Sequence, residues 1–267
     1  TSGQMRYLRK VSKTMKEERS NLSETRIVSL FDIHLPYNIP LEPVFAFIKD
    51  FKPHIVVLGG DVHDFPSVSP WLANQSRAWI GGTLKENYAE MVKGVFQPLA
   101  KATRGREVQI VYLEGNHEWR LRRAVELEPN GEGYWNLEKN LPSSVKLLAM
   151  NVPYKASIHL YYVHGDKIGK HHSAQMSAMW RKSVLYGHVH DVQVTTDVSP
   201  IDVGELYKAA SVGCLCTLNP LFMKNRPNRW VNGFNYAYVE DATGYFADVQ
   251  VYIINGQFIA NGRRYGN

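Results

Sequence analysis

Five short apolar runs, each followed directly by polar residues that can bind a metal ion, constrain the fold of this chain more than any other feature. The runs cover residues 26–31, 54–59, 108–113, 158–163 and 183–186. Residues 41–51 and 84–101, which lie between runs, have the apolar spacing of helices. We expect Pro98 to end or kink the second of these helices near its last turn. Alternation of strands and helices predicts an α/β fold.

The polar residues after the runs form compact motifs. In chain order these are Asp32-Ile33-His34, Asp61-Val62-His63-Asp64, Asn116-His117-Glu118, His164-Gly165-Asp166 and His188-Val189-His190. Strand ends meet at one edge of an α/β sheet, so we expect the motifs to converge in space. Glycines stand before Asp61, Asn116 and His188, where they allow sharp turns and close backbone approach.

The ligand types in these motifs are carboxylate, imidazole and amide, a mixture that suits Mn, Fe, Zn or a similar divalent ion. In Asp-x-His and His-x-His both side chains share one face of an extended chain. Each motif alone is a weak signal, because an isolated histidine at a strand end is usually a hydrogen-bonded structural residue. Five in succession, each after a strand, indicate a metal centre.

As a set, Asp-x-His, Gly-Asp-x-x-Asp, Gly-Asn-His-Glu, a single strand-end histidine and Gly-His-x-His resemble the motifs of calcineurin-like metallophosphoesterases. The chain looks like the stand-alone members found in bacteria and their viruses. The resemblance runs through residues 26–190. It implies an α/β fold, a βαββαβ sandwich of two mixed sheets flanked by helices. The phosphoesterase domain would then span residues 26–267, after a basic N-terminal extension over residues 1–25.

The resemblance also implies a ligand set for two divalent ions, most readily Mn, with Fe, Zn, Ni or Mg as alternatives. One ion would be held by Asp32, His34, Asp61 and His190, and the other by Asp61, Asn116, His164 and His188. Asp61 would bridge the two. In the family, a hydroxide shared by the ions attacks the phosphorus.

Two further residues match the catalytic positions of the family. His117 stands where the family places the proton donor to the leaving group. Asp64, three residues after Asp61, matches the partner that keeps such a histidine protonated, because a neighbouring carboxylate raises the pKa of an imidazole.

Four residues are candidates for contact with substrate: Arg120, Arg123, His63 and His172. Arg120 and Arg123 share one helix face by their spacing, although a solvated helix face is the simpler interpretation. His172 follows a glycine- and lysine-rich loop that could close over a phosphate or simply begin a helix. Cys214-x-Cys216 lacks the second pair that a zinc site needs, and we interpret it as strand packing.

The substrate class is less constrained than the chemistry. The chain has 31 basic and 25 acidic residues, a net charge of +6, which favours an anionic partner but is by itself a weak signal for nucleic acid. The arginines that follow His117 and the basic residues of the N-terminal extension point the same way. A phosphodiesterase or nuclease is therefore our first expectation. A phosphomonoesterase, including a protein phosphatase, fits less well, because Phe65-Pro66 follows Asp64 where protein phosphatases carry Arg-Gly. A small-molecule diesterase stays open, as does a non-catalytic binding protein, although the complete ligand set argues against the latter.

Composition indicates a cytoplasmic protein. No apolar run is long enough to cross a bilayer, and the N-terminus is polar and basic, unlike a secretory signal. In the C-terminal part, Asn255-Gly256 between apolar residues 245–254 and 257–260 predicts a β-hairpin.

Overall fold

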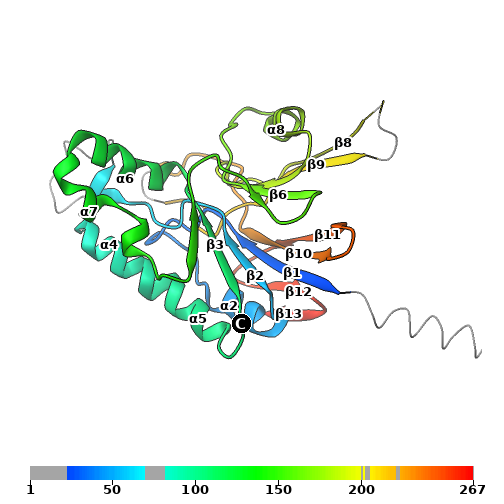
Figure 1. The fold of residues 1–267 in the computed structure, drawn as a ribbon, viewed down its shortest axis with the longest axis horizontal. Helices are drawn as coiled ribbons and strands as arrows, with labels where there is room; N and C mark the ends of the chain where they lie inside the picture. The colour runs from blue at the N-terminus through cyan, green and yellow to red at the C-terminus, as the bar shows by residue number, and fades with distance from the viewer. Residues whose placement is uncertain (1–22, 70–81, 200, 202–204, 221–222, 267) are drawn as a thin grey trace, which may run out of the picture.

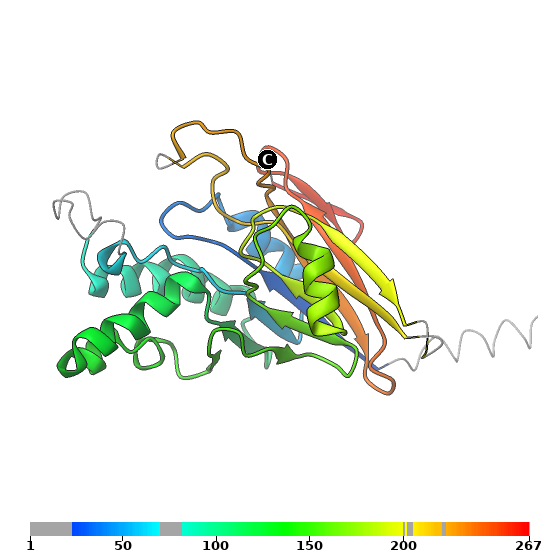
Figure 2. The same cartoon turned by 90° about the horizontal axis from the view of Figure 1, so that it is seen from above.

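Two mixed β-sheets packed face to face form the centre of the molecule in a computed structural model (Figure 1, Figure 2). The structure describes residues 23–69, 82–199, 201, 205–220 and 223–266. The basic extension expected over residues 1–25 lies outside these residues, except for the start of the first strand.

The larger sheet has six strands in the order β11-β10-β1-β2-β3-β4. Strands β1 to β4 run parallel, β10 pairs antiparallel with β1, and β11 pairs antiparallel with β10. Their bounds are Glu24–Leu30 (β1), Ile55–Leu58 (β2), Gln109–Leu113 (β3), Val145–Leu148 (β4), Gly233–Glu240 (β10) and Phe246–Tyr252 (β11). Strand β2 is wholly apolar and buried over its last three residues, and β1 is buried from Ile27 to Leu30, as expected for parallel strands covered on both faces.

The smaller sheet has five strands in the order β5-β6-β7-β9-β8, in which β6, β7 and β9 run parallel. Their bounds are Tyr154–Lys155 (β5), Leu160–Val163 (β6), Ser183–Tyr186 (β7), Val194–Val198 (β8) and Leu206–Ser211 (β9). Apolar side chains from both sheets, among them Phe31, Val57, Tyr162 and Leu185, fill the space between them.

Helices cover the outer faces of both sheets (Figure 1). Helices α2 (Glu42–Phe51), α4 (Leu84–Met91) and α5 (Gln97–Ala102) contribute to the hydrophobic cluster on the six-stranded sheet, and α8 (His172–Trp180) packs on the five-stranded sheet. Further helical segments are α6 (Asn116–Leu127) with α7 (Glu132–Trp135), and η1 (Pro66–Val68), η4 (Pro129–Gly131) and η5 (Glu138–Asn140). The prediction of two mixed sheets flanked by helices is confirmed.

The helix expected over residues 84–101 is interrupted just ahead of Pro98. A π-helical turn, η3 (Val92–Phe96), separates α4 from α5, and Pro98 lies in the first turn of α5. Proline is tolerated there because the first turn of a helix needs no N–H donor.

The expected turn at Asn255-Gly256 forms, with both residues in the left-handed region (φ 52° and 75°) that a type I′ turn requires. Pairing across it ends after the single bridge Ile254–Gln257. Instead, β12 (Phe258–Ala260) pairs with β13 (Arg263–Tyr265). The aromatic rings of Phe258 and Tyr265 pack on Phe47 of α2, which explains why this segment leaves the sheet.

Among the described residues, no helix combines the length and the apolar character needed to cross a bilayer.

Candidate metal centre

The motifs predicted from the sequence meet at one end of the sandwich. Asp32, Asp61 and Asn116 follow β1, β2 and β3 of the larger sheet, whereas His164 and His188 follow β6 and β7 of the smaller one. Hydrogen bonds join the two sets: the His188 backbone N–H donates to Asp32 Oδ2 at 2.8 Å, and the His164 ring contacts Asn116. The site is therefore built by both sheets together.

Most candidate ligands adopt a backbone conformation that side-chain-bearing residues seldom use. The φ angles are positive at Asp32 (51°), His34 (51°), Asp61 (49°), His188 (70°) and His190 (62°). Each costs on the order of 1 kcal/mol, and such strain is concentrated where function requires a particular side-chain direction.

One donor cluster consists of Asp32, His34 and His190. His190 Nε2 lies 3.4 Å from Asp32 Oδ1 and 3.1 Å from His34 Nε2, and all three residues are buried. Asp32 Oδ1 is buried and has no hydrogen-bond partner among the described residues. Two imidazole nitrogens facing an unsatisfied carboxylate oxygen are donors that fit a divalent cation.

The second cluster consists of Asp61, His164 and His188, with Asn116 beside it. His164 Nε2 lies 3.4 Å from Asp61 Oδ2 and 3.1 Å from Asn116 Oδ1, and His188 Nδ1 lies 2.8 Å from the same amide oxygen. The His164 Nδ1–H donates to Gly59 O at 2.9 Å, so the lone pair of Nε2 points into the cluster. This donor set also fits a metal ion.

Asp61 connects the clusters. Its Oδ2 atom lies 3.4 Å from His164 Nε2 in one cluster and 3.7 Å from His34 Nε2 in the other. Burial by itself would raise the pKa of Asp61, but the charges of His117 and His164 hold it well below its ordinary value. Burial likewise opposes protonation of His164, yet Asp61 raises the pKa of that imidazole to about 10. A cation between these groups would take over the charge balance that protons otherwise provide.

His117 and Asp64 lie beside the two clusters. Asp64 Oδ1 is 3.1 Å from His117 Nδ1 and 3.2 Å from His34 Nδ1. Burial opposes ionisation of Asp64, but its hydrogen bonds with the two histidines lower its pKa far below the ordinary value. Burial also disfavours charged His117, whereas Asp61 and Asp64 outweigh it and raise its pKa.

Glycines let the ligand loops approach one another closely, as the sequence predicted. A Cβ atom on Gly115 would stand 2.2 Å from Asp61 Oδ1, and one on Gly187 would stand 2.3 Å from Asp32 Oδ2. The space at Gly60, where φ is 95°, is equally tight, because an added Cβ atom would lie 2.5 Å from His164 Nδ1.

Of the residues expected to contact substrate, Arg120 lies at the site. It donates to the Asp64 backbone carbonyl at 2.9 Å, and its second guanidinium nitrogen lies 3.1 Å from His117 Nε2. Arg123 is exposed on the same helix, α6.

His63 and His172 are placed differently from the prediction. His63 is fully buried, accepts from the Phe65 N–H at 2.8 Å and donates to Glu90 at 2.8 Å. His172 is buried between Tyr186 OH at 2.7 Å and Asp191 at 3.1 Å. Both ring nitrogens of each are engaged within the protein, so we do not assign either residue to substrate contact.

The sequence interpretation gave no role to Glu118, which organises the site. Its buried carboxylate accepts from the backbone N–H groups of Asp61 (2.9 Å), Val62 (2.9 Å) and Gly115 (2.8 Å), and from Tyr112 OH (2.6 Å). The available signal was its position in the first turn of the helix that Asn116 begins, where a glutamate reaches back to the preceding N–H.

Comparison with known proteins adds little beyond the fold. No family model and no curated protein match the chain. A solved structure from Streptococcus pneumoniae, described as a conserved uncharacterized protein and predicted phosphoesterase, is 11% identical with a TM-score of 0.34, over 85% of this chain and 90% of that one. A hypothetical protein from Thermus thermophilus is 13% identical with a TM-score of 0.37, over 84% and 98%. Likenesses this weak carry no argument about activity, which depends on the residues of the site.

Proposed function

We propose that this protein is a phosphoesterase that works with two divalent metal ions, and that phosphodiesters, including nucleic acid, are its preferred substrates. The observation that carries the proposal is the position of Asp61, whose Oδ2 lies between two buried clusters of metal-binding side chains. Two adjoining clusters that share a carboxylate are the arrangement that two-metal hydrolysis requires.

Asp32, His34, Asp61 and His190 would hold one ion, and Asp61, Asn116, His164 and His188 the other. Mn²⁺ is our first choice, with Fe, Zn, Ni or Mg as alternatives. When bound, the ions would supply an activated water and neutralise negative charge on the phosphate.

His117 is the proposed acid. Its Nδ1–H donates to Asp64, which fixes the ring, and its Nε2 lies 3.8 Å from Asp61 Oδ2, next to the proposed ions. From there Nε2–H can give its proton to a leaving-group oxygen. In the protein without metal, Asp61 and Asp64 outweigh burial and raise the pKa of His117. With ions bound at Asp61, the hydrogen bond to Asp64 would be the contact that still favours the protonated ring.

Arg120 is the proposed phosphate contact. Its guanidinium lies 3.1 Å from His117 Nε2, and a phosphate oxygen would be a stronger acceptor than the imidazole nitrogen. Once Arg120 is paired with the phosphate, His117 Nε2 is free to carry its proton.

The preference for diesters is supported by the net charge of +6 and by the residues after Asp64. Phe65 is fully buried there, so this position offers no cation for a phosphate monoester dianion. If nucleic acid is the substrate, binding should weaken steeply as salt rises.

The test compares hydrolysis of bis-p-nitrophenyl phosphate with that of p-nitrophenyl phosphate in the presence of Mn²⁺. We expect the diester to be the better substrate. Preference for the monoester would contradict the diesterase assignment. No turnover of either compound by protein with both ions bound would favour a binding protein.

A further inference from the structure

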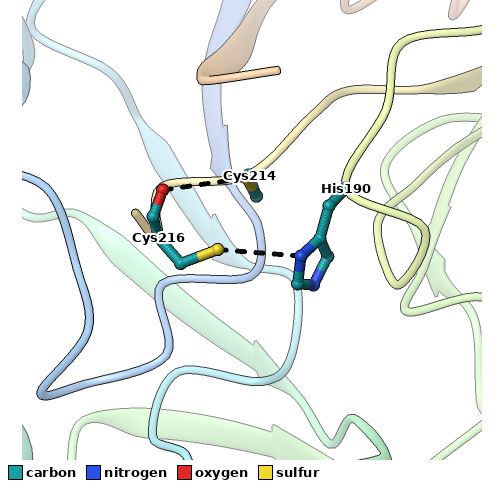
Figure 3. A group of neighbouring side chains, drawn as sticks. All are labelled: His190, Cys214 and Cys216. Atoms are coloured by element: carbon teal, nitrogen blue, oxygen red, sulfur yellow. Dashed lines mark hydrogen bonds between the residues drawn. The ribbon is translucent and has the colours of Figure 1, made fainter. Parts of the chain in front are cut away.

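One ring nitrogen of His190 faces a buried thiol instead of an oxygen. His190 Nε2 points toward Asp32 and His34. The other ring nitrogen, Nδ1, lies 3.6 Å from Cys216 Sγ (Figure 3). Among the described residues, Cys214 and Cys216 form a buried group with His190 in which all three ligand atoms lie within 4.8 Å of one another.

The other histidines of the site that point Nε2 inward use oxygen on the outer side. His34 Nδ1 lies 3.2 Å from Asp64 Oδ1, and His164 Nδ1 lies 2.9 Å from Gly59 O. A carboxylate or carbonyl normally holds a metal-binding histidine in its tautomer and orientation. At His190 this position is taken by sulfur, a weak acceptor.

Cys216 is held rigidly where it meets the ring. It is 2% exposed, its carbonyl accepts from Asn232 at 2.6 Å, and it bridges to Asn38 in the loop that follows His34. Trp230 packs on the His190 ring at a centroid distance of 4.2 Å. The imidazole therefore has little freedom to turn toward another partner.

We propose that Cys216 is a positioning residue for His190: its sulfur accepts the Nδ1–H and thereby directs the Nε2 lone pair into the Asp32, His34 and His190 cluster. This inference rests on the proposed two-metal function. Because sulfur accepts weakly, it adds less electron density to the imidazole than a carboxylate would, and the ion on this side should exchange more readily than its neighbour.

In the first test, the Cys216→Ala variant is titrated with Mn²⁺, and electron paramagnetic resonance measures the free ion at each step. We expect one of the two ions to bind about 10- to 100-fold more weakly and the other to keep its affinity. Cys216→Ser, with a hydroxyl acceptor, should recover part of the affinity.

Cys214→Ala is the matched control, because Cys214 is equally buried in the same segment and its sulfur contacts the carbonyls of Cys216 and Val231. It should leave both affinities unchanged. Equal Mn²⁺ binding by Cys216→Ala and the unmodified protein would overturn the proposal. So would a sulfur-to-cobalt charge-transfer band in the Co²⁺-loaded protein that disappears in Cys216→Ala, since sulfur would then be a ligand itself.

A measurement on the unmodified protein does not depend on any variant folding. In the Zn²⁺-loaded protein, ¹⁵N shifts of His190 should show the proton on Nδ1, and a proton on Nε2 would overturn the proposal. Failure of the proposed function would be a separate result. If the metal-loaded protein hydrolysed no phosphoester, the Mn²⁺ affinities and the position of the His190 proton would still test the role of Cys216.

Discussion

At the scale of single residues, substitutions of His117 and Asp61 should differ in their effects on turnover and metal content. His117→Ala removes the proposed acid but no proposed ligand, so we expect turnover to fall about 10²- to 10⁴-fold with both ions retained. Asp61→Ala removes the shared carboxylate and should lose metal and activity together. Metal analysis of the purified variants, alongside diesterase rates, measures both effects.

His171→Ala is the control for His117, because His171 is exposed next to buried His172. It should change neither rate nor metal content. Loss of both ions from His117→Ala would show that His117 is a ligand and not the acid.

We expect metal binding to depend on pH through His164. In protein stripped of metal, burial opposes the charged ring, but Asp61 raises its pKa from 6.5 to about 10. The contribution of the His164–Asp61 ion pair to the free energy of unfolding is fully present below pH 6.5. It is lost as pH rises through about 10. At pH 7.5 an ion must displace this proton, so we expect release of about one proton and an affinity that rises with pH.

Isothermal titration calorimetry with Mn²⁺ in two buffers of different ionisation enthalpy measures that release. Heats that differ between the buffers are the expected result. Identical heats would mean that His164 is already neutral when the ion arrives.

The sequence predicted the convergence of seven candidate ligands because each follows a strand, and strand ends meet in space. It did not predict the surroundings of His63 and His172, because their partners Glu90, Tyr186 and Asp191 come from other elements. Spacing along the chain carries no information about such contacts. Glu118 was missed although its motif position was visible.

At the scale of elements, the turns after the strands determine the site. Gly115 precedes α6 with extended backbone (φ −95°, ψ −171°) that alanine adopts without strain. Only the contact with Asp61 therefore opposes a side chain there. We expect Gly115→Ala to displace Asp61 and weaken Mn²⁺ binding about tenfold or more.

Gly133→Ala serves as its control, because a Cβ at Gly133 would meet no atom within 4 Å. Mn²⁺ titration of both variants decides the question. An unchanged Mn²⁺ affinity in Gly115→Ala would show that the loops carrying Gly115 and Asp61 can move apart without weakening metal binding.

Strands β1, β2, β3, β6 and β7 were each predicted to within two residues, because continuous apolar runs are a strong local signal. The wide turn Val92–Phe96 and the departure of Phe258–Ala260 from the sheet were not predicted. The second depends on packing against a distant residue, since Phe258 packs on Phe47.

At the scale of the whole molecule, alternating strands and helices predicted the α/β class, and the family resemblance implied two mixed sheets. Strand order could not be read from local patterns. Strand β10 pairs with β1 through contacts such as Val28–Tyr236, across most of the chain. Lys208 on β9 also pairs with Asp248 on β11 at 2.7 Å, which ties the two sheets together.

This union of two sheets brings the candidate ligands into one site. We propose that the site holds two ions. Anomalous diffraction from crystals of the protein grown with Mn²⁺ tests it most directly. We predict two peaks about 3.5–4 Å apart on either side of Asp61, one beside His34 and His190 and the other beside His164 and His188. A single peak, or ions bound away from Asp61, would contradict the account.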